Sequence, residues 1–427
     1  KWMDLSGNSN HAIQANNGYK PQFDTDKITF DGTDDKIMVS NKSQDNNFEF
    51  FIVSKADEDI DGDLDNSDYG ALRLPIEDPQ IQQKQRYLIF PRHGGNEGVA
   101  GLGISYGKNK IKTIEHSGWY IPETAEMSLS EGTHIININL ADNPININVF
   151  PGGTTTYKQP DDLNQGDGGN VGAKKLFIAE EIGGGGYENH FKGDVYEVIR
   201  FDTQLEEEKR IKITHYLAKK WGLTATVDSD GDGVVDDVEI DKGSSPIKQD
   251  TDDDGFIDSV ELANGSDPVD ASSQPANIPK VIKESKLWLD AKNIEGKSTP
   301  DSDNPGLNNN SNISYWMDLS GHGKHATQTE NNNKPEFISA ASNNLPAIKF
   351  DGEAYMSGDA SSFPDKDSPR TAYLIVDNIQ DNKGKSWEFG FYYGGAGKSK
   401  TFGFMLNHDT YNTGFNGWGI DYGTDKT

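Results

Sequence analysis

The chain of 427 residues contains no cysteine. This absence excludes disulfide bridges, zinc–thiolate sites and a cysteine nucleophile. No apolar run reaches the ~18 residues that a membrane-spanning helix needs, and no signal peptide opens the sequence. Basic residues are scarce too, since 40 Lys and Arg stand against 69 Asp and Glu, which gives a net charge of −29. This charge argues against nucleic-acid binding, which a basic surface would favour.

Hydrophobic residues make up only 33% of the chain, but aromatics reach 10% and there are 46 glycines. This composition is typical of a turn-rich β protein. Residues 135–140 and 145–150 alternate apolar and polar positions around Asp142-Asn143-Pro144, which predicts a β-hairpin. A capping box of Thr203 and Glu206 predicts a helix over about 204–221. We expect one face of this helix to carry Leu205, Ile213, Tyr216, Leu217 and Lys220.

Two acidic stretches, residues 228–239 (loop 1) and 250–261 (loop 2), share the spacing of a calcium loop. Asp stands at positions 1, 3, 5 and 9, Gly at position 6 and Glu at position 12. Alternate carboxylates on a tight turn converge on one point, and calcium takes six to eight oxygens. The predicted ligands, with position 7 giving its carbonyl, are Asp228, Asp230, Asp232, Val234, Asp236 and Glu239 in loop 1, and Asp250, Asp252, Asp254, Phe256, Asp258 and Glu261 in loop 2.

The alternative for this stretch is a solvated acidic linker. Residues 226–270 hold 15 acids and 2 lysines, so nearly half of the excess negative charge lies here. Only ten residues separate Glu239 from Asp250, and the turn that begins at Gly243 recurs 22 residues later at Gly265. This spacing leaves no room for a full helix on each side of each loop. The stretch resembles bacterial thrombospondin type 3 repeats, which implies a calcium-stapled linker between domains.

An internal repeat organises the rest of the chain. Residues 2–7 (Trp-Met-Asp-Leu-Ser-Gly, the first motif) reappear as residues 316–321 (the second motif). His11-Ala12 matches His325-Ala326, and the predicted strand 48–53 matches residues 371–376. The sequence therefore predicts two copies of one β domain.

These motifs are similar to those of bacterial laminin-G-like domains in the concanavalin A-like lectin/glucanase superfamily. In that family an opening strand like residues 287–291 precedes the motif, and the domain closes with segments like 191–199 and 216–223. The resemblance implies all-β, concanavalin A-like jelly-roll sandwiches, with the first copy lacking its opening strand and the second its closing half. The expected boundaries are residues 1–223, a linker over 224–275, and residues 276–427.

A third acidic cluster follows the predicted strand 48–53. Its spacing resembles a calcium loop in which Asp replaces Glu at the last position, and a solvated loop is the alternative. The candidate ligands are Asp57, Asp59, Asp61, Asp65 and Asp68. For sugar binding, aromatic faces near loops are the candidates, although aromatics also fill sandwich cores. These candidates are Trp119, Tyr120, Tyr393 and Trp418.

No catalytic site is expected. The paired carboxylates that glycoside hydrolases need do not occur at strand spacing, because Asp194 and Glu197 are three residues apart. We expect a structural segment of a long, repetitive, secreted or cell-surface bacterial protein (a stalk, fibre or adhesin) rigidified by Ca²⁺. The alternative is a carbohydrate-binding adhesin module, and a polysaccharide-acting enzyme is the least favoured. Expected partners are cell-surface glycans or proteins, a further copy, or a longer chain that continues Lys1 or Thr427, with no nucleic acid and no membrane insertion in this segment.

Overall fold

The computed structural model describes residues 1–40, 49–60, 87–93, 100–117, 126–139, 145–157, 175–179, 190–300, 302–359, 363, 371–376, 389–394, 401–405 and 420–421. The chain divides into two compact units. The first comprises residues 1–230 and 235–248, and the second comprises residues 231–234 and 249–427. The change from one unit to the other therefore falls inside the predicted linker. Among the described residues, no helix combines the length and the apolar character needed to cross a bilayer.

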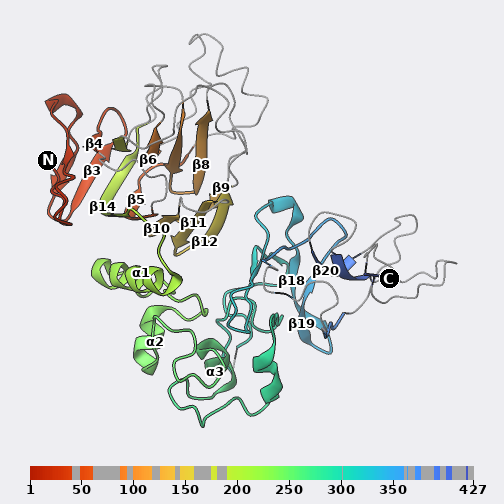
Figure 1. The fold of residues 1–427 in the computed structure, drawn as a ribbon. Helices are drawn as coiled ribbons and strands as arrows, with labels where there is room; N and C mark the ends of the chain where they lie inside the picture. Colours follow the sequence, from red (N-terminus) through yellow and green to blue (C-terminus); the bar gives the residue numbers. More distant parts are fainter. Residues whose placement is uncertain are drawn as a thin grey trace, which may run out of the picture. The chain divides into compact units, whose positions relative to one another are not determined.

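Two antiparallel sheets of seven strands each form the first unit (Figure 1). One sheet has the order β1 (Ala12–Ile13), β4 (Ile37–Ser40), β13 (Lys175–Ile178), β6 (Tyr87–His93), β7 (Ala100–Tyr106), β8 (Lys110–Ser117) and β9 (Glu126–Ser128). The other has the order β12 (Gly153–Tyr157), β11 (Ile145–Phe150), β10 (Thr133–Asn139), β5 (Glu49–Ala56), β14 (Lys192–Phe201), β3 (Lys27–Asp31) and β2 (Gln22–Asp24). Strands distant in sequence lie side by side, so the fold is an all-β jelly-roll sandwich, as predicted.

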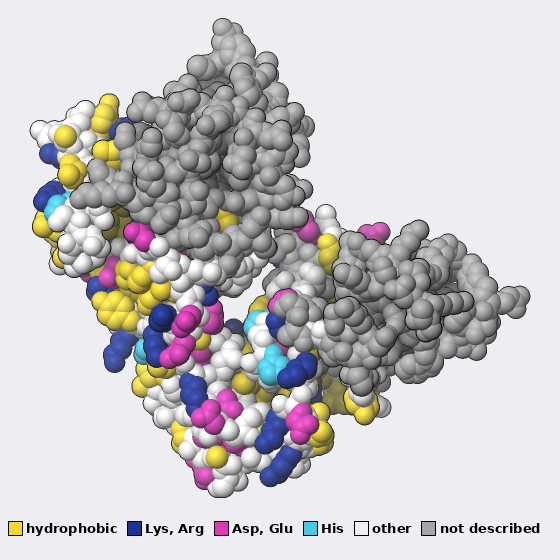
Figure 2. All heavy atoms as spheres, in the orientation of Figure 1, with side chains coloured by type: hydrophobic (Ala, Val, Ile, Leu, Met, Phe, Trp, Pro, Cys, Tyr) yellow, Lys and Arg dark blue, Asp and Glu magenta, His cyan; other side chains and the backbone are white. Residues whose placement is uncertain are grey.

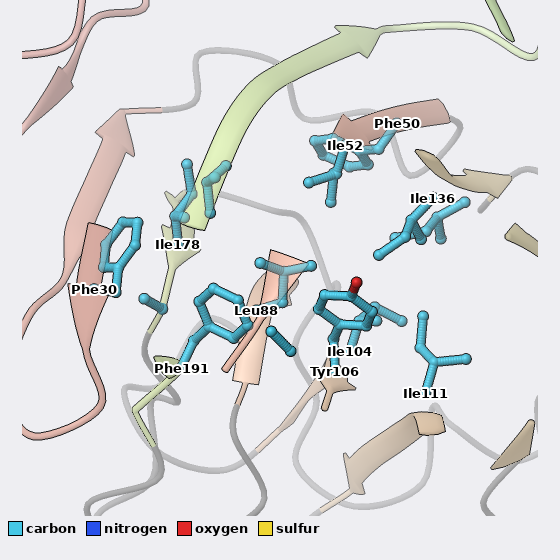
Figure 3. Close-up of a cluster of buried hydrophobic side chains, with 14 of the residues drawn as sticks. Phe30, Phe50, Ile52, Leu88, Ile104, Tyr106, Ile111, Ile136, Ile178 and Phe191 are labelled. Carbon is cyan, nitrogen blue, oxygen red and sulfur yellow. The ribbon is translucent and has the colours of Figure 1, made fainter. Parts of the chain in front are cut away.

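The main core lies between the two sheets. Side chains at alternate positions of β5 and β10 point inward, among them Phe50, Ile52 and Ile136, and they meet Leu88 and Ile104 from the opposite sheet (Figure 3). Each fully buried side chain of this size contributes roughly 1.5–3 kcal/mol. The predicted hairpin is confirmed, because residues 135–139 of β10 pair antiparallel with residues 146–150 of β11.

Helix α1 (Glu207–Trp221) covers the outer face of the sheet that contains β5. Leu217 and Ala218 pack there on Phe51 and Val53, so β5 is buried on both of its faces. Burial on both faces explains why its sequence is apolar without alternation.

Two details of the predicted helix are wrong. The N-cap is Glu206 and it makes no side-chain cap hydrogen bond, so the capping box does not form. Acidic residues in the first turn interact favourably with the helix dipole instead. Tyr216 is 50% exposed, because the stripe that faces the sheet is made of Thr214, Leu217 and Ala218.

The second unit contains smaller sheets and short helices. The sheets consist of β15 (Ser311–Asn312) with β18 (Glu336–Ser342) and β19 (Leu345–Lys349), β16 (Tyr315–Trp316) with β17 (Ala326–Thr327), and β20 (Phe389–Gly394) with β21 (Thr401–Met405) and β22 (Ile420–Asp421). Among the described residues, the 3-10 helices are η1 (Asn17–Tyr19), η3 (Lys280–Glu284) and η4 (Asn331–Asn333).

The predicted strand over 371–376 is wrong, since these residues form no strand and are exposed. The matching strand β5 is held by β10 and β14. Counterparts of these two partners are not among the described residues of the second copy, and a single strand without partners is not stable in water.

Candidate metal sites

Loop 1 and loop 2 have the same local structure. In each, the glycine at position 6 adopts a left-handed conformation, with φ of 100° at Gly233 and 96° at Gly255. A seven-residue helix then begins at position 9, α2 (Asp236–Lys242) after loop 1 and α3 (Asp258–Asn264) after loop 2. Each helix ends at a left-handed glycine, so the loop–helix unit repeats every 22 residues with no second helix between the units.

The carboxylates at positions 1, 3 and 5 converge in both loops. Asp228, Asp230 and Asp232 each offer an oxygen within 4.8 Å of the others, and Asp250, Asp252 and Asp254 form an equivalent group. Asp232 is fully buried and Asp254 is 9% exposed. These acidic clusters can hold a metal ion, because alternate carboxylate oxygens around one point are the donor set of a hard divalent cation.

Loop 2 buries carboxylate oxygens that accept no hydrogen bond. They are Oδ1 of Asp250, Oδ2 of Asp252, Oδ2 of Asp254 and both Oε atoms of Glu261, whose side chain is fully buried. Leaving a buried polar atom without a partner costs about 1–3 kcal/mol, and more when it is charged. Five such oxygens within one twelve-residue loop leave a requirement for partners, which protons or a cation could meet.

The electrostatics of loop 2 agree with this requirement. Burial, followed by repulsion from Asp254 and Asp252, raises the pKa of Glu261 to about 8. Burial also raises the pKa values of Asp250 and Asp252. A cation among these groups would favour the ionised carboxylates and lower all three pKa values.

The aspartates at position 9 have a different environment from those at positions 1, 3 and 5. Both oxygens of Asp236 accept hydrogen bonds from Ser229, through its N–H at 2.9 Å and its hydroxyl at 2.8 Å. Asp258 accepts the same pair from Thr251, at 2.8 and 2.7 Å. His215 Nδ1 lies 2.8 Å from the Asp236 carboxylate as well. Position 9 therefore ties the start of each loop to the start of its helix.

These hydrogen bonds between positions 2 and 9 were not predicted from the sequence. The signal was a hydroxyl residue at position 2 of both loops, Ser229 in loop 1 and Thr251 in loop 2. Position 7 also has a structural role through its N–H. Val234 donates to Asp232 Oδ1 at 2.8 Å, and Phe256 donates to Asp254 Oδ1 at 2.9 Å. These bonds hold the position-5 carboxylates in orientation.

The apolar side chains of loop 2 anchor it in the second unit. Phe256 and Ile257 are 2% and 5% exposed, and they pack with Met317 and Leu319 of the second motif. Val260 completes this buried cluster, and the partly buried side chains of Ile278, Trp288 and Tyr315 pack against the cluster. The apolar residue at position 8, Ile257, thus joins the loop to a packed core.

The third predicted acidic cluster lies largely outside the described residues. Asp57 and Asp59 are described and exposed, whereas Asp61, Asp65 and Asp68 fall outside. A different group was not predicted, in which Asp31, Asp34 and Asp35 approach one another after β3. The N–H groups of Thr33 and Asp34 donate to Asp31 Oδ1, and the Asp31 N–H donates to Asp35 Oδ2, so local turn bonds account for this group.

Of the aromatic sugar-binding candidates, Trp119, Tyr120 and Trp418 lie outside the described residues, and Tyr393 lies on β20. One described hollow, of about 230 Å³, is lined by amide and charged side chains with Ala354 at its edge. It offers no aromatic face for a sugar ring.

The carboxylates of β14 do not form a pair. Asp194 accepts from Lys27 and Thr29. Glu197 accepts instead from Lys220 and Trp221. Each carboxylate therefore has its own structural partners.

No protein-family model and no curated protein matches this chain. Solved structures similar to it include the CBM40 of the Ruminococcus gnavus IT-sialidase (10% identity, 40% of this chain and 83% of that chain, TM-score 0.27). Another is Trypanosoma rangeli sialidase in complex with sialic acid (15% identity, 49% of this chain and 30% of that chain, TM-score 0.32). A third is domain 4 of AbnA, a GH43 extracellular arabinanase from Geobacillus stearothermophilus, in complex with arabinotriose (9% identity, 42% of this chain and 72% of that chain, TM-score 0.27). At these TM-scores the likenesses assign neither a ligand nor an activity to this chain.

Proposed function

We propose that this chain is a structural segment of a repetitive extracellular or cell-surface bacterial protein, in which loops 1 and 2 bind Ca²⁺. In this proposal the sandwiches are laminin-G-like modules and the loops belong to a linker of the thrombospondin type 3 kind. The observation that carries it is the set of five buried carboxylate oxygens in loop 2 that accept no hydrogen bond.

Calcium suits this donor set better than other common cations. The side-chain donors proposed for loop 2 are carboxylates, and the backbone carbonyl of Phe256 at position 7 is a further oxygen donor. Zinc prefers nitrogen and sulfur ligands, and magnesium retains several waters in a near-ideal octahedron. Glu261 can supply both of its oxygens, which gives the coordination number above six that calcium accepts.

Binding would supply folding free energy to the linker. Without a cation, the buried acids of loop 2 repel one another, and α3 together with the Phe256 anchor must form against that repulsion. Because the ligands come together only in the folded loop, the free energy of cation binding is also free energy of folding. A stiff joint between similar modules would follow from this coupling and would make a stalk or fibre.

Isothermal titration of the whole chain with Ca²⁺ tests the assignment. We expect binding at loops 1 and 2, and we expect Glu261→Gln to remove the binding at loop 2 because it deletes a bidentate carboxylate. Glu284→Gln is the matched control, since Glu284 is an exposed acid outside both loops. No heat of binding in millimolar Ca²⁺, or unchanged stoichiometry in Glu261→Gln, would contradict the proposal.

The structural role has its own measurement. Small-angle scattering with Ca²⁺ and with chelator should show a less extended and more variable particle once the cation is removed. Identical scattering curves would contradict the structural role, because they would show that the cation does not stiffen the chain.

A second candidate is a carbohydrate-binding adhesin module. Its support is that the chain has a β-sandwich fold and that similar structures include a carbohydrate-binding module in complex with sialyllactose. A glycan array probed with the calcium-loaded chain tests it, and no bound glycan would leave the structural role. Neither candidate function includes a catalytic step. Release of reducing sugar when the chain is incubated with polysaccharides would contradict this expectation.

A further inference from the structure

The first and second motifs have the same internal hydrogen bonds. The N–H of Asp4 donates to His11 Nδ1 at 3.1 Å, and the N–H of Asp318 donates to His325 Nδ1 at the same distance. Each aspartate then accepts from two further backbone N–H groups, those of Ser6 and Asn10 in the first motif and of Ser320 and Lys324 in the second. The two motifs are therefore equivalent folded turns.

The second motif is covered by the segment that precedes it. The N–H of Leu319 donates to Trp288 O at 2.8 Å, and the Trp288 N–H donates to Asp318 Oδ1 at 2.9 Å. The N–H of Met317 donates to Ile294 O at 2.8 Å. Loop 2 completes the cover, so that Met317 and Leu319 are only 1% and 4% exposed.

The corresponding residues of the first motif are exposed. Met3, the counterpart of Met317, is 53% exposed, and Leu5, the counterpart of Leu319, is 95% exposed. Hydrophobic side chains are visible at the surface over the N-terminal elements in Figure 2. Trp2 packs against the sandwich core in spite of this exposure, so the motif itself is in place. The first motif thus presents a folded apolar face whose equivalent is an intramolecular interface elsewhere in the same chain.

We propose that Met3 and Leu5 form a docking site for a cation-loaded loop followed by a tryptophan-bearing extended segment, of the chemistry found in residues 249–294. The interface on the second motif shows what such an occupant supplies. An aromatic and an aliphatic residue at loop positions 7 and 8 would cover the Met and Leu side chains, and backbone carbonyls like those of Trp288 and Ile294 would accept from the motif's N–H groups.

The occupant is a further segment of this kind and not residues 249–294 of this chain. Those residues already pack on Met317 and Leu319, and leaving that interface would expose two buried side chains there. The need for a cation in the occupant rests on the proposed function of loop 2. The apolar docking on Leu5 stands without it.

Fluorescence anisotropy of a labelled peptide with the sequence of residues 249–294, titrated with the whole chain in millimolar Ca²⁺, tests the site. We expect saturable binding that Leu5→Asp weakens about tenfold or more, because it places a charge at the centre of an apolar contact. The matched control is Phe23→Asp, which changes another exposed apolar side chain, 71% exposed on β2, outside the motif. We expect this control to bind as the unchanged chain does.

Several results would overturn the docking site. They are no binding of the peptide, equal binding by Leu5→Asp, or equal loss in Leu5→Asp and Phe23→Asp. Self-association of the chain that depends on Leu5 and that the peptide does not compete with would also overturn it, because the occupant would then be a second copy. Repeating the titration in chelator separates the two proposals. Leu5-dependent binding that persists there supports the docking site while contradicting the cation requirement, whereas binding lost there supports both.

Discussion

Loop 1 and loop 2 share their ligand positions but differ in what surrounds them. In both loops the Asp carboxylates at positions 1, 3 and 5 converge. In both, the Asp at position 9 also accepts a hydrogen bond from a hydroxyl residue at position 2. Position 7 is Val234 in loop 1 and Phe256 in loop 2, and position 4 is Gly231 or Asp253. The acidic pattern is therefore repeated in both loops, whereas the side chain at position 7 differs in size and packs in an apolar cluster in loop 2.

The comparison shows that one spacing brings the same carboxylates together while local packing decides how each loop is anchored. Phe256 packs in an apolar cluster with Met317 and Leu319 of the second motif, which gives loop 2 a hydrophobic anchor independent of any metal. In loop 1, Asp236 lies beside His215 of α1 instead. The two sites are therefore expected to respond differently to substitution and to pH.

The largest expected effect is the pH dependence of the calcium-free protein. The pKa of Glu261 is raised to about 8 in the folded chain, from 4.5, so the folded state binds more protons than the unfolded state between these values. The free energy of unfolding should therefore fall by several kcal/mol as pH rises through this window. Urea unfolding in chelator at a series of pH values measures it. Glu261→Gln should flatten the profile.

Truncation at position 7 tests the anchors. Phe256→Ala should cost about 3–4 kcal/mol, because it leaves a cavity among Ile257, Val260 and Leu319. Val234→Ala should cost about 1–2 kcal/mol, since it removes fewer apolar groups. Both are measured by urea unfolding in saturating Ca²⁺, where the cation contribution is constant. Equal losses would mean that loop 2 has no stronger anchor than loop 1.

The glycines at position 6 sharpen the same contrast. A Cβ at position 233 would lie 2.7 Å from Gly296 Cα and 2.9 Å from Glu295 O, and backbone atoms cannot easily move away. At Gly255 the nearest atom is Lys283 Cδ at 2.8 Å, which a flexible side chain can withdraw.

Gly233→Ala should accordingly cost about 2–3 kcal/mol and Gly255→Ala about 1 kcal/mol in thermal unfolding. Gly243→Ala isolates the cost of the positive φ, because no atom lies within 4 Å of its Cβ. A loss in Gly233→Ala no larger than in this control would show that the close approach to Gly296 is absent in solution.

The smallest effect is expected at position 4. Asp253 holds a left-handed φ of 63°, and Gly231 holds 77° at the same place in loop 1. Asp253→Gly should change the free energy of unfolding by no more than about 0.5 kcal/mol, because relief of the backbone is offset by a more flexible unfolded chain. Gly231→Asp should cost about 1 kcal/mol. Chemical denaturation of both variants checks whether the two turns are interchangeable.

The sequence predicted those parts of the molecule that depend on local spacing. Alternating residues predicted the hairpin of β10 and β11, and the acidic pattern predicted that the carboxylates at positions 1, 3 and 5 converge, although positions 9 and 12, which it also named, are not part of those groups. The bonds of Ser229 and Thr251 to the position-9 aspartates could not be predicted from ligand patterns, because they depend on how each loop folds back onto its helix.

Errors arose where tertiary contacts decide the outcome. Tyr216 fits an apolar helical pattern but is exposed, because the orientation of α1 on its sheet selects Leu217 and Ala218. Residues 371–376 resemble β5 in sequence, but a strand also needs a neighbouring strand to pair with, as β10 pairs with β5. Leu5 is exposed whereas Leu319 is buried, although the two motifs have identical sequences. This difference could not be predicted from the motifs, because burial depends on which other segment packs against each of them.

The position of β14 in its sheet has a mechanical consequence. This strand leads into α1 and is bonded along one edge to β5 and along the other to β3. A pulling force that enters the sandwich through α1 reaches Phe201 first, where β14 is paired with β5 alone, and must then rupture ladders on both edges over residues 193–195 before the strand can be extracted. Such an interior attachment resists extension more strongly than a strand peeled one bond at a time from the rim.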